Sequence, residues 1–473
     1  MPVSPQYRPA PVVTVLGTDY YDPVAPARFP QHRLRFRNQR WAERVGLEAL
    51  DAAEWEQHFA TFAPLPDNLT EPLALRYHGH QFRSYNPQLG DGRGFLYAQL
   101  CDAGDARLLD LGTKGSGQTP WSRDGDGRLT LKGGVREVLA TEMLEALGVY
   151  TSKSFSLFET GERLFRGDEP SPTRSSVLVR LSHSHVRFGS FQRYAYLGER
   201  PQLATLLDYA VQHYYPALAE PHVANTPVAF LREVGRRSAQ LCASWMMAGF
   251  VHGVLNTDNM NITGESFDYG PYRFLPTYDP DFTAAYFDHH GLYAFGRQPA
   301  IVQWNLEQLA KALSHLSPRP GLEEALQSFE VEFEGALIAR LLARFGLASR
   351  GPDEDAALGS ATFQFLAESQ VGYEQFFFDW YGGATSVDRA LAGPAADTYS
   401  GARFTALRRL FDDYAPLAPE RLATAYYQRP RPCTLLIDEI EAIWDAIAAR
   451  DDWSLFAAKL EAIGEMRAAA AAD

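Results

Sequence analysis

Two oxygen-bearing side chains, Asn259 and Asp268, have the types and the spacing of a divalent-metal site. One amide oxygen and one carboxylate, completed by phosphate oxygens and water, suit octahedral Mg²⁺, which seldom uses a cage built from protein alone. Asp258 directly precedes Asn259 and could take a proton from an acceptor hydroxyl, although a turn residue that caps the loop explains it equally. These residues together indicate chemistry on a metal-bound nucleotide phosphate.

The segment from His252 to Asn259 has the frame H-x-D-x-x-x-x-N of a protein-kinase catalytic loop, with one exception. Kinases place their proton-accepting aspartate two residues after the histidine, and here that position is Val254. Asp268-Tyr269-Gly270 is a variant of the metal-binding D-F-G. The metal half of a phosphoryl-transfer site is present without its usual base, which indicates either an inactive kinase or different chemistry on ATP. We expect His252 to make a structural hydrogen bond to the backbone.

Lys114 and Glu137 could direct an ammonium group at the nucleotide. Lys114 follows a strand-like run, and Glu137 lies in the first turn of a helix predicted over residues 135–147. A strand lysine held by a helix glutamate is how kinases engage nucleotide phosphates. Taken singly, a solvated lysine and a glutamate favoured at a helix N-terminus explain the two residues. Both residues precede the 252–268 segment in the order found in kinases, and this order favours the ion pair over two solvated side chains.

Two glycine-rich loops are further candidates for the nucleotide site. Gly90, Gly92 and Arg93 lie before a predicted strand, where a glycine backbone lets N–H groups approach a phosphate closely. A tight hairpin turn explains the same glycines. Asp126 and Gly127 belong to a second loop, which has the composition of an ordinary turn but lies between Lys114 and Glu137 in the chain.

Arg180 and Arg187 are candidates for binding phosphate oxygens, because the guanidinium donors form a fork. The alternative is a pair of surface arginines. Arg180 lies within the apolar run 177–181, where a charge needs a partner or a ligand. His183 and His185 alternate along the same segment and are assigned to packing or hydrogen bonding.

Composition limits the class of protein. The 473 residues are 46% hydrophobic, which suffices for a large packed core, and the net charge of −14 disfavours nucleic-acid and anionic-membrane partners. The three widely spaced cysteines form no C-x-x-C and indicate neither a zinc site nor a disulfide framework. The first residues lack the pattern of a signal peptide, and no apolar run approaches the ~18 residues of a membrane span. We expect a cytoplasmic protein.

The pattern of elements changes along the chain. Strands are predicted at 94–100, 107–111, 154–158 and 176–181, whereas the long helical patterns after residue 203 cover 230–248, 300–316, 322–345 and 435–449. This order predicts an α+β, protein-kinase-like two-lobed fold. Residues 1–203 would form a strand-containing N-lobe with Lys114 and the helix of Glu137. Residues 204–473 would form a mainly helical C-lobe with the catalytic and metal loop at 252–271.

In this order, the segments resemble the selenoprotein O family of pseudokinase-fold proteins. The resemblance is carried by residues 86–93, Lys114 with 119–123, 125–128, 136–137, 186–189, 252–260 and 268–271. These segments lie between about residues 77 and 310, and the whole length is similar to a bacterial member. The combination of Asn-Thr-Asp-Asn-Met at 256–260 with Asp-Tyr-Gly-Pro at 268–271 is highly specific.

The resemblance implies a protein adenylyltransferase, in which ATP binds in an orientation flipped relative to kinases and AMP passes to a Ser, Thr or Tyr hydroxyl of a protein acceptor. It implies that the metal, Mg²⁺ or alternatively Mn²⁺, is held by Asn259 and Asp268, and that Asp258 is the active-site acid or base. Glu137 would pair with Lys114. The residues implied to hold the nucleotide are Gly90, Gly92, Arg93, Lys114, Asp126, Gly127, Arg180, Arg187 and the metal-bound Asp268. The reversed orientation of ATP would also explain Val254, because a base at the kinase position would then have no group to deprotonate.

The sequence departs from the family pattern in two places. Bulkier residues, His78 and Arg83, stand in the run 77–83 where the family has small ones, and no Cys or selenocysteine ends the chain. The resemblance therefore implies no redox role for such a terminal residue here.

Three other functions remain open at the level of the sequence. They are UMP transfer with Mn²⁺, a conventional phosphotransferase with Asp258 as its base, and a pseudokinase scaffold that binds ATP only to set its shape. The retention of both metal ligands argues against the scaffold, since a pure scaffold could lose either.

Overall fold

The computed structural model describes residues 3–167, 169–220 and 223–471. Its first part is built around an eight-stranded sheet with the order β1–β3–β6–β7–β10–β9–β2, and β8 pairs with β10. Neighbouring strands of this sheet are antiparallel. Its strands are β1 (Tyr21–Pro23), β2 (Arg33–Arg37), β3 (Leu73–Leu75), β6 (Leu96–Cys101), β7 (Leu108–Lys114), β8 (Leu129–Thr130), β9 (Lys153–Leu164) and β10 (Thr173–Ser182). Two small ribbons pair β4 (Gly79–Gln81) with β5 (Ser84–Asn86), and β11 (Phe250–Val251) with β12 (Arg273–Phe274).

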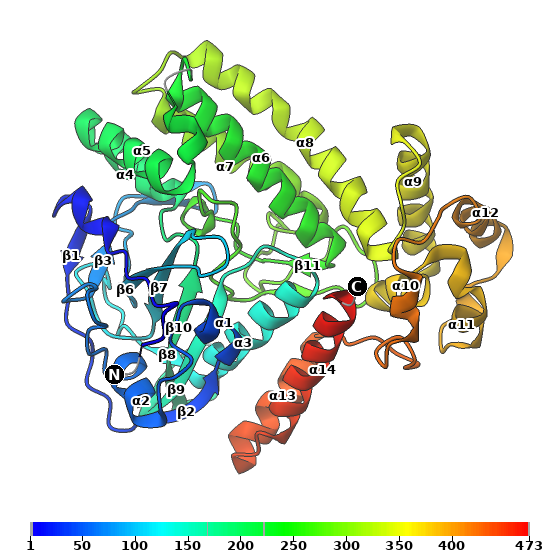
Figure 1. Ribbon diagram of the computed structural model, residues 1–473, viewed down its shortest axis with the longest axis horizontal. Coiled ribbons are helices and arrows are strands. Elements are labelled where there is room, and N and C mark those ends of the chain that lie inside the picture. The colour runs from blue at the N-terminus through cyan, green and yellow to red at the C-terminus, as the bar shows by residue number, and fades with distance from the viewer. Residues whose placement is uncertain (1–2, 168, 221–222, 472–473) are drawn as a thin grey trace.

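Helices accompany the sheet and make up most of the rest of the chain (Figure 1). Those of the first part are α1 (Gln39–Arg44), α2 (Ala52–Phe59), α3 (Leu131–Ala146), α4 (Phe188–Leu197) and α5 (Arg200–Tyr214). Those that follow are α6 (Thr226–Met247), α7 (Gln298–Leu313), α8 (Arg319–Phe345), α9 (Pro352–Ser369), α10 (Tyr373–Asp379), α11 (Val387–Ala392), α12 (Gly401–Phe411), α13 (Ile437–Arg450) and α14 (Ser454–Ala471). The expected class, strands first and mainly helices in the second half, is confirmed.

The central strands are buried on both faces. Every residue of β7 is buried, and successive residues of β10 belong to different cores because side chains alternate across a strand. Val177 and Val179 pack in the cluster that contains Trp55 of α2, whereas Leu178 packs in the cluster that contains Val138 of α3. The sheet therefore lies between α2 on one face and α3 on the other.

Helix α3 confirms the helix predicted over residues 135–147, but it begins earlier, at Leu131. The Oγ1 of Thr130 accepts a hydrogen bond from the backbone N–H of Gly133 at 3.1 Å, which caps the helix before the two glycines that follow. Gly134 suits its position because a Cβ there would lie 2.5 Å from Leu157 of β9. Close packing against the sheet thus explains the glycines at the helix start.

The predicted long helices correspond to α6, α7, α8 and α13. Helices α4 and α5 had not been expected, and residue 203, the expected boundary between the lobes, lies inside α5. Phe188, Phe191 and Tyr194 of α4 are buried and follow helical spacing, which is the signal that could have revealed this helix. Because α4 packs against α7, it belongs spatially with the helical part.

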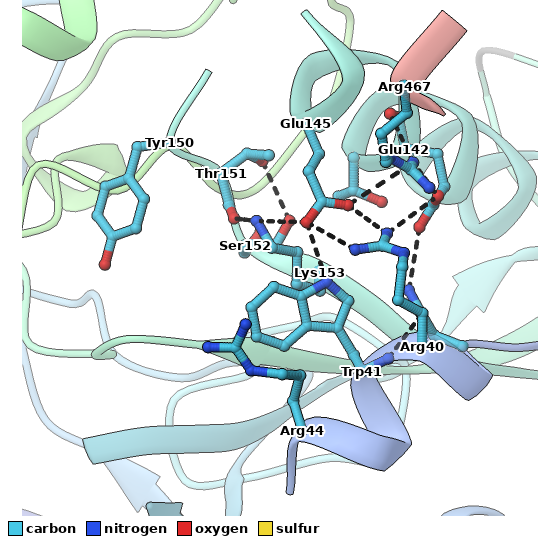
Figure 2. Close-up of polar contacts among 12 residues, drawn as sticks. Arg40, Trp41, Arg44, Glu142, Glu145, Tyr150, Thr151, Ser152, Lys153 and Arg467 are labelled. Carbon is cyan, nitrogen blue, oxygen red and sulfur yellow. Dashed lines mark hydrogen bonds and ion pairs between the residues drawn. The ribbon is translucent and has the colours of Figure 1, made fainter. Parts of the chain in front are cut away.

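Helices α13 and α14 return from the helical half to α3 (Figure 1). Lys132 of α3 forms an ion pair with Glu441 of α13 at 2.6 Å. Arg467 of α14 contacts the carboxylate of Glu142, and its NH2 lies 3.6 Å from Glu145 Oε2 (Figure 2). The helix that carries Glu137 is therefore held by the sheet on one side and by α14 on another.

Candidate nucleotide and metal site

One cavity of about 720 Å³ is lined by residues from both parts of the chain. Most of the residues expected to bind nucleotide or metal lie in its wall: Gly90, Gly92, Arg93, Asp126, Gly127, Arg187, Asp258, Asn259 and Asp268. Lys114 and Arg180 are buried in contact with Asp268, and Glu137 is buried in contact with Lys114. Segments that the sequence separates widely thus converge on one place.

Lys114 ends the central strand β7 and is 4% exposed. Its ammonium group contacts the carboxylate of Glu137 on α3, so the two residues form the ion pair that the sequence indicated. The same Nζ lies 2.7 Å from Asp268 Oδ1. A single buried ammonium group therefore connects the sheet, α3 and the metal loop.

A second cationic side chain, Arg180 of β10, also contacts Asp268. Its NH1 donates to Asp268 Oδ1 at 3.1 Å. This contact supplies the partner that a charge inside the run 177–181 requires. Burial opposes ionisation of Asp268, but Lys114, Arg180 and further arginines hold its pKa well below the ordinary value. The backbone of Asp268 has φ of 64°, a region that non-glycine residues seldom adopt and that often occurs at functional sites. Asp268 is thus an ionised carboxylate fixed in an unusual conformation.

Asn259 ends the short 3₁₀ helix Thr257–Asn259. Its Nδ2 donates to the carbonyl oxygen of Val254 at 3.0 Å. This bond fixes the orientation of the amide and leaves its oxygen as the end that can bind a cation. Val254, the residue that replaces the kinase base, therefore positions Asn259 through its backbone.

Asp258 is 8% exposed, and its Oδ1 has no hydrogen-bond partner within the described part of the chain. Burial raises the pKa of Asp258 to about 7, although the nearby Arg187 opposes the shift. Gly79 of β4 leaves the space for this side chain, because a Cβ there would lie 2.9 Å from Oδ1. A buried carboxylate oxygen without a partner, next to a cavity, is suited to accept a proton.

Arg187 connects the loop that contains Asp258 with the loop that contains Asp91. Its NH1 donates to the backbone oxygen of Asp258 at 3.0 Å, and its NH2 donates to Asp91 Oδ1 at 3.1 Å. Its guanidinium carbon lies 4.3 Å from the ring centre of Tyr77. Two of its nitrogens are therefore engaged by protein oxygens, whereas its Nε has no hydrogen-bond partner among the described residues.

The glycines of the first loop are required by packing against Trp121. A Cβ on Gly90 would lie 2.4 Å from Trp121 Cγ, and a Cβ on Gly92 would lie 2.8 Å from the Trp121 backbone oxygen. Trp121 Nε1 donates to Asp22 at 2.9 Å, which fixes the ring. Sequence reasoning gave Trp121 no role of its own, although an aromatic residue between two glycine-rich loops could have indicated one.

The second loop also lines the cavity, and its Asp126 is exposed. Gly127 has φ of 70°, and a Cβ there would lie 2.2 Å from the Gly117 backbone, so only glycine fits. Asp126 is bound by Arg166 at 2.8 and 3.0 Å. Arg166 and the exposed Phe165 come from the β9–β10 hairpin and line the same cavity. Neither was expected, and their surface loop carries no sequence signal that distinguishes them.

The histidines have structural contacts. His252 Nε2 lies 3.1 Å from the carbonyl oxygen of Phe267, which confirms its predicted bond to the backbone. His183 Nδ1 lies 2.6 Å from the Tyr150 hydroxyl, and His185 Nδ1 lies 3.3 Å from Asp110 Oδ2. Within the described ranges, no group of three or more His, Cys, Asp or Glu side chains could hold a metal ion.

The two departures from the family pattern lie outside the cavity wall. His78 is buried and makes hydrogen bonds to the Tyr85 hydroxyl at 2.8 Å and to Arg193 at 2.9 Å. The guanidinium carbon of Arg83 lies 5.5 Å from the ring centre of Trp304. Both substitutions are thus accommodated by neighbouring side chains.

The cysteines and the helices add two further observations. Cys101, Cys242 and Cys433 are all unpaired. Among the residues that the structure describes, no helix combines the length and the apolar character needed to cross a membrane.

Comparison with known proteins decides the family. The sequence model of the family described as "Protein adenylyltransferase SelO" matches residues 4–464. The chain belongs to the SelO family. The SelO resemblance that the motifs indicated is thereby confirmed over nearly the whole chain, and with it the expectation of a nucleotidyltransferase.

Curated SelO relatives carry the name "Protein nucleotidyltransferase YdiU". The protein from Synechocystis sp. is 47% identical over 458 residues, which cover 94% of this chain and 95% of the relative. The protein from Gloeobacter violaceus is 48% identical over 469 residues, which cover 97% of this chain and 94% of the relative. The protein from Vibrio cholerae is 37% identical over 391 residues, 80% of this chain and 77% of the relative.

Proposed function

We propose that this chain transfers AMP from ATP to a Ser, Thr or Tyr hydroxyl of a protein acceptor. The observation that carries the proposal is the position of Asp258 beside Asn259 at the cavity, while the kinase base position is Val254. The Oδ1 of Asp258 is buried and has no hydrogen-bond partner among the described residues. The family membership supports nucleotidyl transfer. A typical protein kinase would instead have an aspartate at residue 254 as its base.

The fold proposed for this activity is a protein-kinase-like pair of lobes with the cavity between them. The first lobe contains the eight-stranded sheet and α3, and the second contains the helical part with the loop 252–271. We place the boundary between the two lobes at Phe188, where α4 begins, and not at residue 203, because α4 packs against α7.

Asn259 and Asp268 are the proposed ligands of a divalent cation, for which we favour Mg²⁺. The donor set fits, because the Asn259 amide is oriented by Val254 and Asp268 is held ionised by its cationic neighbours. When bound, the cation would neutralise charge on the phosphate oxygens. Mn²⁺ is the alternative that a metal titration of activity would reveal.

The other residues are proposed to orient ATP and move one proton. Gly90, Gly92 and Gly127 keep the loops close enough for backbone contacts to phosphates, while Arg93 and Arg187 present positive charge to the cavity. Lys114 and Arg180 fix Asp268. Asp258 Oδ1 takes the acceptor proton as the hydroxyl oxygen bonds to the α-phosphorus. The bond between that phosphorus and the bridging oxygen then breaks, and pyrophosphate leaves.

Mass spectrometry of the chain and an added protein acceptor, after incubation with ATP and Mg²⁺, tests this proposal. An AMP adduct is expected, whereas a phosphate adduct would replace the proposal with conventional phosphotransfer. UMP transfer is the second candidate, because the curated relatives are named as nucleotidyltransferases without a specified nucleotide. A larger yield from UTP with Mn²⁺ would favour it, and ATP binding without any adduct would favour a scaffold.

A further inference from the structure

A second cavity, of about 330 Å³, shares no lining residue with the nucleotide cavity. Its wall contains four arginines: Arg107, which precedes β7, Arg236 and Arg237 of α6, and Arg340 of α8. Tyr150 and His183 also line it, and no carboxylate of the described residues does. We call this the arginine pocket. A cationic pocket is unexpected in a chain with a net charge of −14.

The arginines of the pocket are only partly neutralised. Arg340 has no ion pair among the described residues, and its NH1 donates to the backbone oxygen of Gly148 at 3.1 Å. Burial lowers the pKa of Arg340, and no carboxylate of the described residues opposes this shift. Arg236 and Arg237 share one carboxylate, Glu233, at 2.5 and 3.1 Å. The three arginines thus have one acidic partner in direct contact.

Arg107 is the fourth cation and is weakly paired. Its ion-pair distances to Asp102 and Asp105 are 3.6 and 3.5 Å, and Asp102 lies closer to Arg44, at 2.6 Å. Its Nε has no hydrogen-bond partner in the described part of the chain. Its NH1 donates to the Tyr150 hydroxyl at 3.3 Å, and that hydroxyl lies 2.6 Å from His183 Nδ1. Among the described residues, Arg107 therefore has two long carboxylate contacts and one hydrogen bond to Tyr150, and no close ion pair.

The positive potential of the pocket acts on His183. Burial first, and then the charges of Arg107 and Arg237, lower the pKa of His183 to about 3. His183 is consequently neutral at physiological pH, and its Nδ1 shares a hydrogen bond with the Tyr150 hydroxyl. The positive charge of the pocket therefore comes from its four arginines, and His183 does not add to it.

We propose that the arginine pocket binds a small phosphate-bearing anion. Guanidinium groups bind phosphate oxygens through paired, charge-assisted hydrogen bonds, and like charges brought together require an anion to offset their repulsion. The volume lies at the lower end of small-molecule sites. Because the two cavities share no residue, this site is independent of the proposed AMP transfer.

The pocket also touches the loop that carries the proposed metal ligands. Thr263 and Gly264, between Asn259 and Asp268 in the chain, belong to its wall. The backbone N–H of Ser266, in the same loop, donates to the backbone carbonyl oxygen of Tyr150 at 2.9 Å. This hydrogen bond connects the loop to Tyr150, which also lines the pocket. An anion bound here would lie against the backbone of the metal loop.

Isothermal titration calorimetry with inorganic pyrophosphate, in metal-free buffer at constant ionic strength, tests the proposal. The wild-type chain and an Arg93→Gln variant, which lacks a cation of the nucleotide cavity, should both bind the probe. In either background, Arg340→Gln should weaken this binding about tenfold, which corresponds to about 1.4 kcal/mol. Arg236→Gln, at a more exposed position, is the second variant if Arg340→Gln does not fold.

Arg232→Gln is the matched control, because Arg232 lies on α6 one turn before Arg236 but does not line the pocket. It should bind pyrophosphate as the wild type does. The proposal is overturned if the wild type does not bind pyrophosphate, or if both pocket variants bind it unchanged. Citrate at equal ionic strength should bind more weakly, and equal affinity would overturn the assignment to phosphate.

Discussion

The ammonium group of Lys114 lies 2.7 Å from the carboxylate of Asp268, and it also contacts Glu137. The lysine comes from the sheet, Glu137 from α3, and Asp268 from the loop of the helical part. Any displacement of α3 therefore changes the surroundings of a proposed metal ligand. The contact makes the sheet, the helix and the loop one electrostatic unit.

Replacing Asp268 by Ala is expected to reduce AMP transfer by at least about a thousandfold. The loss follows because several kcal/mol of charge stabilisation by the cation disappear with its carboxylate ligand. Mass spectrometry of acceptor modification checks this result, and Asp281→Ala at an exposed position is the control. Wild-type turnover of Asp268→Ala would rule out the metal assignment.

Asp258→Ala is expected to leave ATP affinity nearly unchanged while transfer falls by about 10² to 10⁴, the usual contribution of a general base. The side chain makes no hydrogen bond through Oδ1 to any residue that the structure describes, so its removal disturbs few contacts. Titration with a non-hydrolysable ATP analogue measures the affinity, and single-turnover kinetics measure the transfer step. Normal transfer by this variant would show that Asp258 is structural.

Lys114→Ala and Glu137→Gln are expected to weaken nucleotide binding in a non-additive way. Each substitution breaks the same buried ion pair, so the second change costs less once the first is made. A double-mutant cycle on the affinity for the ATP analogue measures the coupling. Additive effects of the two substitutions would show that Glu137 does not act through Lys114.

Gly90→Ala is expected to destabilise the chain by about 1–3 kcal/mol and to weaken ATP binding, because the added methyl group displaces the Trp121 ring from the cavity wall. Denaturant unfolding and nucleotide titration measure the two effects. The exposed Gly167, where a Cβ would meet nothing within 4 Å, is the control position for Ala. An unchanged Gly90→Ala variant would contradict the close packing described for this loop.

Glu145 is expected to make the stability of the chain depend on pH in the acid range. Burial opposes its ionisation, but Lys153, Arg40 and Arg467 lower its pKa from 4.5 to about 2 (Figure 2). A lowered pKa in the folded state contributes stability above pH 4.5 that is lost as the pH falls toward 2. The shift corresponds to roughly 3 kcal/mol at most.

Urea unfolding of wild type and Glu145→Gln between pH 2 and 7 measures this contribution. The difference in free energy of unfolding should be largest above pH 4.5 and should shrink toward pH 2. Glu461→Gln, an exposed position on α14, should show no such trend. A difference that stays constant over the whole range would rule out the proposed role of Glu145 ionisation.

The sequence predicted which segments would converge on one cavity better than it predicted the contacts among their side chains. The central strands, α3 and the long helices followed from hydrophobic periodicity, and the motifs placed Lys114, Glu137, Asn259 and Asp268 in one region. Periodicity reports which face of an element is buried and does not report what covers it. The contact of Arg180 with Asp268 was therefore beyond reach, although the burial of Arg180 had indicated that it needs a partner.

The glycine loops show a second limit. Gly90 and Gly127 have the composition expected of a phosphate-binding loop, but each also faces a close neighbour from a distant segment. A sequence shows that glycine is present and does not show which atom would collide with a side chain there. Helix α4 is a different case, because its buried residues Phe188, Phe191 and Tyr194 follow helical spacing and the sequence does carry its signal.

The packing of α13 and α14 on α3 has a consequence for synthesis. Residues 437–471 supply part of the surface that holds the helix of Glu137, and a ribosome makes them after every residue proposed for the site. Domains form during translation only when the segments that complete them have emerged. We therefore expect the growing chain to lack the finished Lys114–Glu137 clamp, and with it nucleotide transfer, until α14 has emerged.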